Sequence, residues 1–107
     1  MLPKNFRLNL KKDFKWVATG KKIEGKFLKM FIKLGDNQNV RVGIAVSATI
    51  FKKAVLRNKA KRLTAQAFQS IIDRLPKNIN IVALPKIAIL SVKSSEVSLD
   101  LEEMLQN

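Results

Sequence analysis

Two stretches in the first half of the chain alternate apolar and polar residues, as half-buried β-strands do. The apolar positions are Leu28, Met30, Ile32 and Leu34 within residues 25–35, and Val40, Val42, Ile44 and Val46 within residues 39–48. The polar residues between the stretches, which begin with Asp36 and Asn37, predict a turn. We therefore expect the two strands to form an antiparallel hairpin.

Three other segments space their apolar residues as amphipathic helices do. The first begins at Leu10 and stops at Gly20, the longest runs from about Lys52 to Leu75, and the last covers residues 94–107. Residues 78–84 form a nearly continuous apolar run that predicts a buried strand, whereas residues 87–92 fit either a strand or the approach to the last helix. The resulting order, α-β-β-α-β-α, predicts an α+β fold, a two-layer sandwich in which the long helix packs on a small sheet.

Charge adds a second pattern. The chain of 107 residues has 21 Lys and Arg against 8 Asp and Glu, a formal net charge of +13. Residues 1–62 contain 17 of the basic side chains and 3 of the acidic ones, whereas residues 63–107 contain 4 and 5. This asymmetry favours a basic working face over a surface that is charged only for solubility, and the large net charge suggests a polyanionic partner.

The basic residues are densest in the first half of the long helix, where the sequence reads VLRNKAKRL. At about 100° per residue, Arg57, Asn58, Lys61 and Arg62 fall within an arc of roughly 140°. No acidic residue occurs between Lys52 and Ser70, so the arc has no partners for i,i+4 ion pairs. Phosphates placed against the arc would relieve its repulsion and release counterions, so we expect Arg57 and Arg62 to serve binding rather than stability.

The composition excludes several other classes. Without Cys or His the chain has no disulfides, no common structural zinc site and no imidazole catalysis. No apolar run is long enough to cross a membrane, and Lys4 and Arg7 interrupt any secretory leader, so we expect a cytoplasmic protein with no membrane partner. A basic, acid-poor N-terminus also fits an organellar presequence. The scattered carboxylates share no catalytic motif, so we expect no active site carried by the protein.

The window VGIAVSATIFKKAVLRNKAKRLTAQAFQ, residues 42–69, resembles the protein subunit of bacterial ribonuclease P. The matching positions of that family's signature helix are Arg57, Asn58, Lys59, Lys61, Arg62, Ala67 and Phe68. KKDFKWVATGKK upstream is similar to the family's first helix, and INIVALPK downstream is similar to its last strand. The chain departs from the family pattern at Lys59, where an arginine is usual, and at Ala65, Ala48, Thr49, Ala18 and Leu84.

This resemblance implies the order α-β-β-β-α-β-α, with one more strand, a mixed sheet and a left-handed parallel crossover through the basic helix. Residues 1–107 would form a single RNA-binding domain. It would bind the catalytic RNA and the 5′ leader of precursor tRNA, while the RNA with magnesium removes the leader. No obligatory protein partner is implied.

The residue pattern and the resemblance together predict two groups of site residues. Those for the catalytic RNA are Lys52, Lys53, Arg57, Asn58, Lys59, Lys61 and Arg62, with a magnesium ion near Asn58. Those for a leader-binding cleft between the first helix and the sheet are Lys11, Lys12, Phe14, Lys15, Trp16 and Phe31. The residues themselves leave two alternatives open for each aromatic ring, stacking on RNA or packing in the core.

Two other functions remain open at this stage. A ribosomal-type or general RNA-binding protein of similar build would bind RNA without taking part in processing. A DNA-binding module fits less well, because the basic helix lacks a turn followed by a recognition helix.

Overall fold

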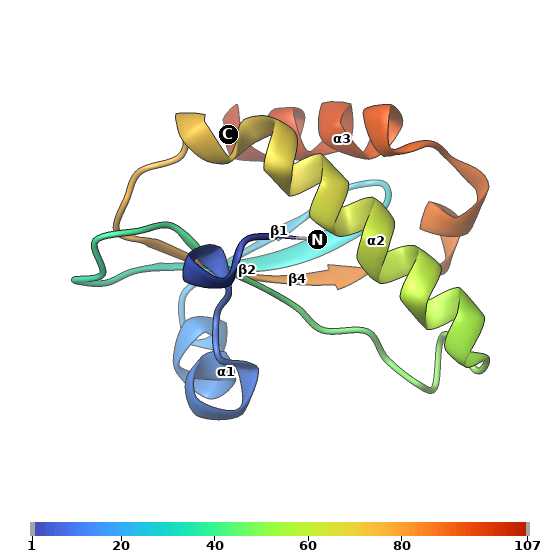
Figure 1. The fold of residues 1–107 in the computed structure, drawn as a ribbon, viewed down its shortest axis with the longest axis horizontal. Helices are drawn as coiled ribbons and strands as arrows, with labels where there is room; N and C mark the ends of the chain where they lie inside the picture. Colours follow the sequence, from blue (N-terminus) through green and yellow to red (C-terminus); the bar gives the residue numbers. More distant parts are fainter. Residues whose placement is uncertain (1, 107) are drawn as a thin grey trace.

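In the computed structural model, which describes residues 2–106, a four-stranded mixed sheet lies between helices on its two faces (Figure 1). The strands are β1 Lys21–Glu24, β2 Leu28–Leu34, β3 Arg41–Ile44 and β4 Ile79–Pro85. The helices are α1 Leu10–Ala18, α2 Ala54–Ile71 and α3 Ser94–Gln106, with 3-10 helices η1 Lys4–Phe6, η2 Ile72–Arg74 and η3 Ile87–Ser91. The α+β class and the element order implied by the resemblance are confirmed. None of these helices is long and apolar enough to span a membrane.

Strand β4 separates β2 from β3, so the hairpin expected between residues 25–35 and 39–48 is wrong. β2 pairs antiparallel with β1 and with β4, and β3 pairs parallel with β4. Every residue of β4 except Leu84 is buried. A strand of this kind is most stable with both faces covered and both edges paired, so β4 takes the central position despite its distance along the chain.

The first strand, β1, was not visible in the apolar pattern. Its sequence KKIE has Ile23 as its single apolar residue, so it shows no alternation. It supplies the further strand that the resemblance implies. Residues 87–92 form η3 and the approach to α3, one of the two alternatives left open by the sequence.

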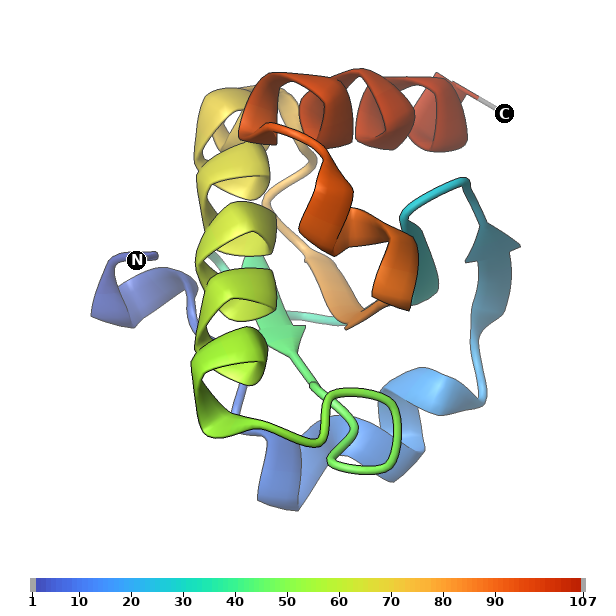
Figure 2. The ribbon, with the colours of Figure 1, turned by 90° about the vertical axis from the view of Figure 1, so that its right-hand side faces the viewer.

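Helix α2 connects β3 to its parallel neighbour β4, so β3, α2 and β4 form a crossover unit. The left-handed sense of this unit stays a prediction from the resemblance. Helix α3 meets the C-terminal half of α2, where the Ser70 and Ser98 hydroxyls lie 3.0 Å apart (Figure 2). The N-terminal half of α2 projects past α3 in both views (Figures 1 and 2).

The two faces of the sheet carry separate apolar clusters. The larger one fills the space beneath α2 and α3 and includes the fully buried Phe51 and Phe68. The smaller one lies under α1 and is centred on Leu8, Val17 and Val82. The two-layer description thus holds for the sheet with α2 and α3, and α1 adds cover on the opposite face.

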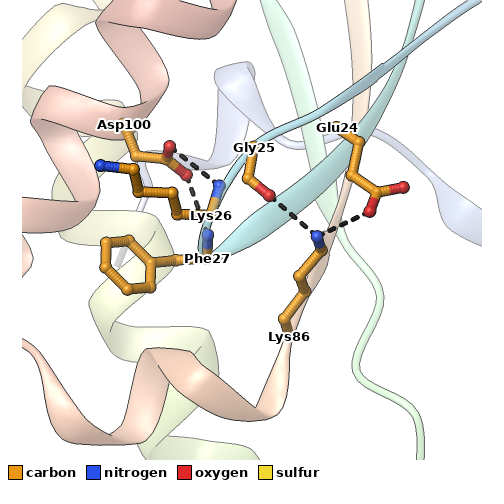
Figure 3. A network of polar contacts seen from close by, with 6 residues as sticks. All are labelled: Glu24, Gly25, Lys26, Phe27, Lys86 and Asp100. Atoms are coloured by element: carbon orange, nitrogen blue, oxygen red, sulfur yellow. Dashed lines mark hydrogen bonds and ion pairs between the residues drawn. The ribbon is translucent and has the colours of Figure 1, made fainter.

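Two polar side chains, Asp100 and Lys86, hold the turn between β1 and β2 (Figure 3). The buried Asp100 carboxylate on α3 accepts hydrogen bonds from the backbone N–H groups of Lys26 and Phe27, both at 3.0 Å. The Lys86 ammonium donates to the Gly25 carbonyl and to the Glu24 carboxylate, both at 2.8 Å. These contacts tie the β1–β2 hairpin to α3 and to the end of β4.

Candidate nucleic-acid interface

The N-terminal half of α2 and the residues before it carry polar side chains that we call the basic strip. Its members are Lys52, Lys53, Arg57, Asn58, Lys61 and Arg62. All except the half-buried Arg57 are exposed. The opposite side of α2 is buried and includes Ala60, Leu63, Thr64, Ala67 and Phe68. Packing of that side against the core therefore holds the strip toward solvent.

No carboxylate within residues 2–106 forms an ion pair with the basic strip. The ion pairs of the structure include Arg74 with Glu102 and Lys86 with Glu24, and none involves a strip residue. The α2 N-terminus adds to the positive field, because Lys53 makes no side-chain cap and the first turn contains no acidic residue. The surface is therefore ready to receive phosphate groups.

Arg57 has a structural role as well as a place in the strip. Its Nη1 donates to the Phe51 carbonyl at 2.9 Å and to the Lys52 carbonyl at 3.3 Å. These hydrogen bonds hold the loop before α2 against the helix. The sequence predicts a binding role for Arg57 without a stabilising one, and the structure adds the stabilising contact. The guanidinium has five N–H donors, so it keeps capacity for a phosphate.

Lys59 lies away from the strip. Its Nζ donates to the Leu90 carbonyl at 3.1 Å, which directs the side chain toward η3. At 100° per residue, position 59 is about 200° from Arg57, so the helix geometry separates them. Lys59 therefore links α2 to η3.

The residues around Asn58 do not form a magnesium site by themselves. Magnesium prefers carboxylate and phosphate oxygens, whereas the neighbours of Asn58 one turn along α2 are Lys61 and Arg62. No group of three or more Asp and Glu that could hold a metal ion occurs among residues 2–106. An ion near Asn58 would need oxygen ligands from an RNA.

A second surface lies on the α1 side of the sheet, and we call it the apolar cleft. Phe14 of α1 and Phe31 of β2 are half-buried and pack on the same small cluster as Ala45 and Leu84. A hollow of about 410 Å³ continues from Ala45 and Leu84. Its other lining residues are Glu24, Lys29, Ser47, Ile50, Pro85, Lys86 and Ile87. The structure thus brings Phe14 and Phe31 into one cluster, and the hollow adjoins that cluster through Ala45 and Leu84.

The cleft residues Lys29, Ser47 and Lys86 are absent from the predicted site. Lys29 could have been found, because it lies on the same strand face as Phe31. The hydrogen bond and the charge of the Lys86 ammonium hold the pKa of Glu24 below its usual value. The hydrogen bonds of Lys86 to the Glu24 carboxylate and the Gly25 carbonyl keep it beside the hollow.

The remaining predicted residues of α1 separate into two groups. Lys11, Lys12 and Lys15 are exposed and form a cationic side of the helix. Trp16 is 41% exposed and lies apart from Phe14, against the end of β2, with the Lys33 ammonium 5.1 Å from its ring centroid. Trp16 lines a different hollow from the one in the apolar cleft.

Comparison with known proteins finds similarity over nearly the whole chain. A family model described as Ribonuclease P matches residues 2–107. The ribonuclease P protein component of Pseudanabaena sp. is 32% identical over 107 residues, which cover 98% of this chain and 92% of the relative. That of Thermotoga maritima is 31% identical over 81 residues, which cover 75% and 68%.

Solved structures agree with the fold. The RNase P protein from Thermotoga maritima superposes with a TM-score of 0.80 at 28% identity and covers 92% of this chain and 94% of its own. A Staphylococcus aureus RNase P protein mutant with defective mRNA degradation activity gives a TM-score of 0.82 at 23% identity, covering 96% and 87%, a likeness that concerns the fold alone.

Proposed function

The chain belongs to the ribonuclease P protein family, and on this premise we propose that it is the cytoplasmic protein subunit of a ribonuclease P. In this role it binds the catalytic RNA and the 5′ leader of precursor tRNA and assists removal of the leader. The catalytic RNA, with magnesium, hydrolyses the phosphodiester bond.

The observation that carries this proposal is the unpaired basic strip on α2. Five of its six members are exposed, and the buried side of α2 packs against the core and so keeps them directed toward solvent. Each phosphate contact releases counterions and so contributes favourable, salt-dependent free energy. Lys61 and Arg62 supply charge, and the planar Arg62 guanidinium can bind a phosphate through two parallel hydrogen bonds. The strip is the proposed contact with the catalytic RNA.

The apolar cleft is the proposed contact with the single-stranded leader. Phe14 and Phe31 offer aromatic surface to unpaired bases, and the hollow that adjoins their cluster at Ala45 and Leu84 has room for a base. Lys11, Lys12 and Lys15 on α1 are the proposed partners of the leader phosphates. By holding the leader here, the protein orients the precursor tRNA so that its scissile bond lies in the active site of the catalytic RNA.

Reconstitution tests the proposal. The full chain is mixed with its catalytic RNA and a precursor tRNA at a magnesium concentration too low for the RNA to act alone. We expect efficient release of the 5′ leader from the mixture and no cleavage by the protein alone. Arg62→Ala removes one cation of the basic strip and is tested in the same assay. Its matched control is Lys22→Ala, which removes an exposed cation from the outer strand β1.

Two results would count against the proposal. RNA binding without any stimulation of cleavage would instead favour a ribosomal-type or general RNA-binding protein. Tighter binding to duplex DNA than to precursor tRNA would favour a DNA-binding module.

A further inference from the structure

A hollow of about 630 Å³ opens between α1 and the loop that joins β2 to β3. We call it the Trp16 hollow. Its lining residues are Asp13, Trp16, Gly35, Asp36, Asn37, Gln38, Asn39, Arg41 and Asn80. The lining is mostly polar and contains one large aromatic ring, a combination suited to a flat ligand with hydrogen-bonding edges.

The indole of Trp16 is available to a ligand. Its side chain is 41% exposed and belongs to neither of the two apolar clusters. The Lys33 ammonium lies over the ring, 5.1 Å from its centroid, and donates to the Thr19 hydroxyl at 2.6 Å, so a positive charge is held over one face of the indole. The other face of an exposed tryptophan of this kind is a stacking platform for a nucleobase.

Side-chain hydrogen bonds from Asn80 and Asn37 hold the floor of the hollow. Asn80, buried in β4, donates from Nδ2 to the Asn37 side-chain oxygen at 2.8 Å. The Asn37 amide donates in turn to the carbonyls of Asn39 at 2.7 Å and Lys77 at 3.2 Å. The loop is therefore formed before any ligand arrives, which lowers the entropic cost of binding.

Gly35 allows this close packing. A Cβ at that position would lie 3.0 Å from the Asn37 oxygen, the Asn80 nitrogen and the Trp16 ring. Contacts this short are tighter than almost all those made by real side chains, so the glycine lets Trp16 and the two amides converge.

The charges of the lining indicate which part of a nucleotide fits. Asp13 and Asp36 carry two negative charges against the one positive charge of Arg41. Carboxylates repel a phosphate but accept hydrogen bonds from base N–H groups. Guanine presents two adjacent N–H donors that match the two oxygens of one carboxylate. Arg41 in the lining and Lys33 at Trp16 supply the positive charge for the flanking phosphates.

We propose that the Trp16 hollow binds one unpaired base of RNA, preferably guanine, stacked on Trp16 and separate from the apolar cleft. This inference rests on the proposed RNA-binding function. It gives the protein a second point of contact with single-stranded RNA, on the far side of α1 from Phe14.

Intrinsic fluorescence tests this directly, because Trp16 is the single tryptophan and the chain has no tyrosine. The full chain is titrated with end-labelled seven-nucleotide RNAs, uridine throughout or with one central guanosine, adenosine or cytidine. We expect the guanosine RNA to quench the Trp16 emission most strongly and to bind most tightly by fluorescence anisotropy. Since stacking contributes about 1–3 kcal/mol per base, Trp16→Leu should weaken its binding by about 5-fold to about 150-fold.

Matched variants test the chemistry of the site. Trp16→Phe keeps an aromatic face and should retain most of the affinity. Asp13→Asn or Asp36→Asn should reduce the preference for guanosine over adenosine, because an amide offers one donor and one acceptor in place of two acceptors. Lys22→Ala removes an exposed cation on β1, outside both hollows, and should leave the guanosine-dependent quenching in place.

Three results would overturn the inference: equal quenching by all four RNAs, an unchanged affinity in Trp16→Leu, or quenching by magnesium chloride alone without a response to RNA. The proposed function is judged separately by the reconstitution. A chain that stimulates leader removal but fails these titrations refutes the Trp16 site alone.

Discussion

Replacing Arg57 and Arg62 one at a time separates a stabilising contact from a binding contact on the same helix. Both belong to the basic strip, but Arg57 is half-buried and donates to two backbone carbonyls, whereas Arg62 is exposed. Alanine at either position removes one positive charge. Only alanine at position 57 also releases the loop that precedes α2.

The expected magnitudes follow from these contacts. Hydrogen bonds from a charged donor contribute about 1.5–3 kcal/mol when buried, so partial exposure of Arg57 reduces its loss to about 1–2 kcal/mol. For a domain of this size, that loss lowers the melting temperature by about 5–15 °C. Arg62→Ala should change the free energy of unfolding by less than about 0.5 kcal/mol.

RNA binding should respond differently from stability. Each variant that loses a phosphate contact should reduce the slope of log K against log salt concentration by about 0.7–0.9. The assay combines urea unfolding, followed by Trp16 fluorescence, with filter binding of the catalytic RNA at several salt concentrations. Lys22→Ala controls for the loss of one positive charge away from the strip.

We therefore expect Arg62→Ala to change the salt slope alone and Arg57→Ala to change both quantities. If Arg62→Ala leaves the slope unchanged, Arg62 does not contact a phosphate. If Arg57→Ala unfolds at the same urea concentration as the native chain, its hydrogen bonds to the loop contribute no net stability.

Three further predictions concern the scaffold. Asp100→Ala leaves two backbone N–H groups of the β1–β2 turn without their acceptor, so urea unfolding should show a loss of about 1–3 kcal/mol, and Asp100→Asn a smaller loss. Gly20→Ala places a Cβ against the Ile32 carbonyl oxygen, so thermal unfolding should show that the free energy of unfolding falls by about 1–3 kcal/mol or more. An unchanged melting temperature would contradict this close approach. The lowered pKa of Glu24 means that its pair with Lys86 stabilises the fold above the usual pKa of 4.5 and that this contribution is lost as the pH falls through the folded value. In urea unfolding, the free energies of unfolding of the native chain and Glu24→Gln should therefore differ at pH 6, and this difference should shrink as the pH is lowered below 4.5. A constant difference would refute the assignment.

The local patterns of this sequence determined the helices, most strands and the direction of the basic strip. Apolar spacing located α1, α2, α3, β2, β3 and β4, because burial of one face depends on neighbours three, four or two positions away. The same spacing placed Arg57, Lys61 and Arg62 on one side of α2, and charge density indicated a polyanionic partner. The family resemblance supplied the extra strand.

The tertiary structure alone decided which distant segments meet. The turn between β2 and β3 predicts that these strands pair with each other, and it does not indicate that β4 lies between them. The order of the strands depends instead on which strand needs both faces covered. In the same way, the carbonyls that receive Arg57 and Lys59 come from backbone folded back against α2. Trp16 and Phe14 are two residues apart and so about 200° apart around α1, which the sequence already indicates. The tertiary structure decides what each meets: Phe14 packs on the cluster under α1, and Trp16 lines the hollow beside the β2–β3 loop.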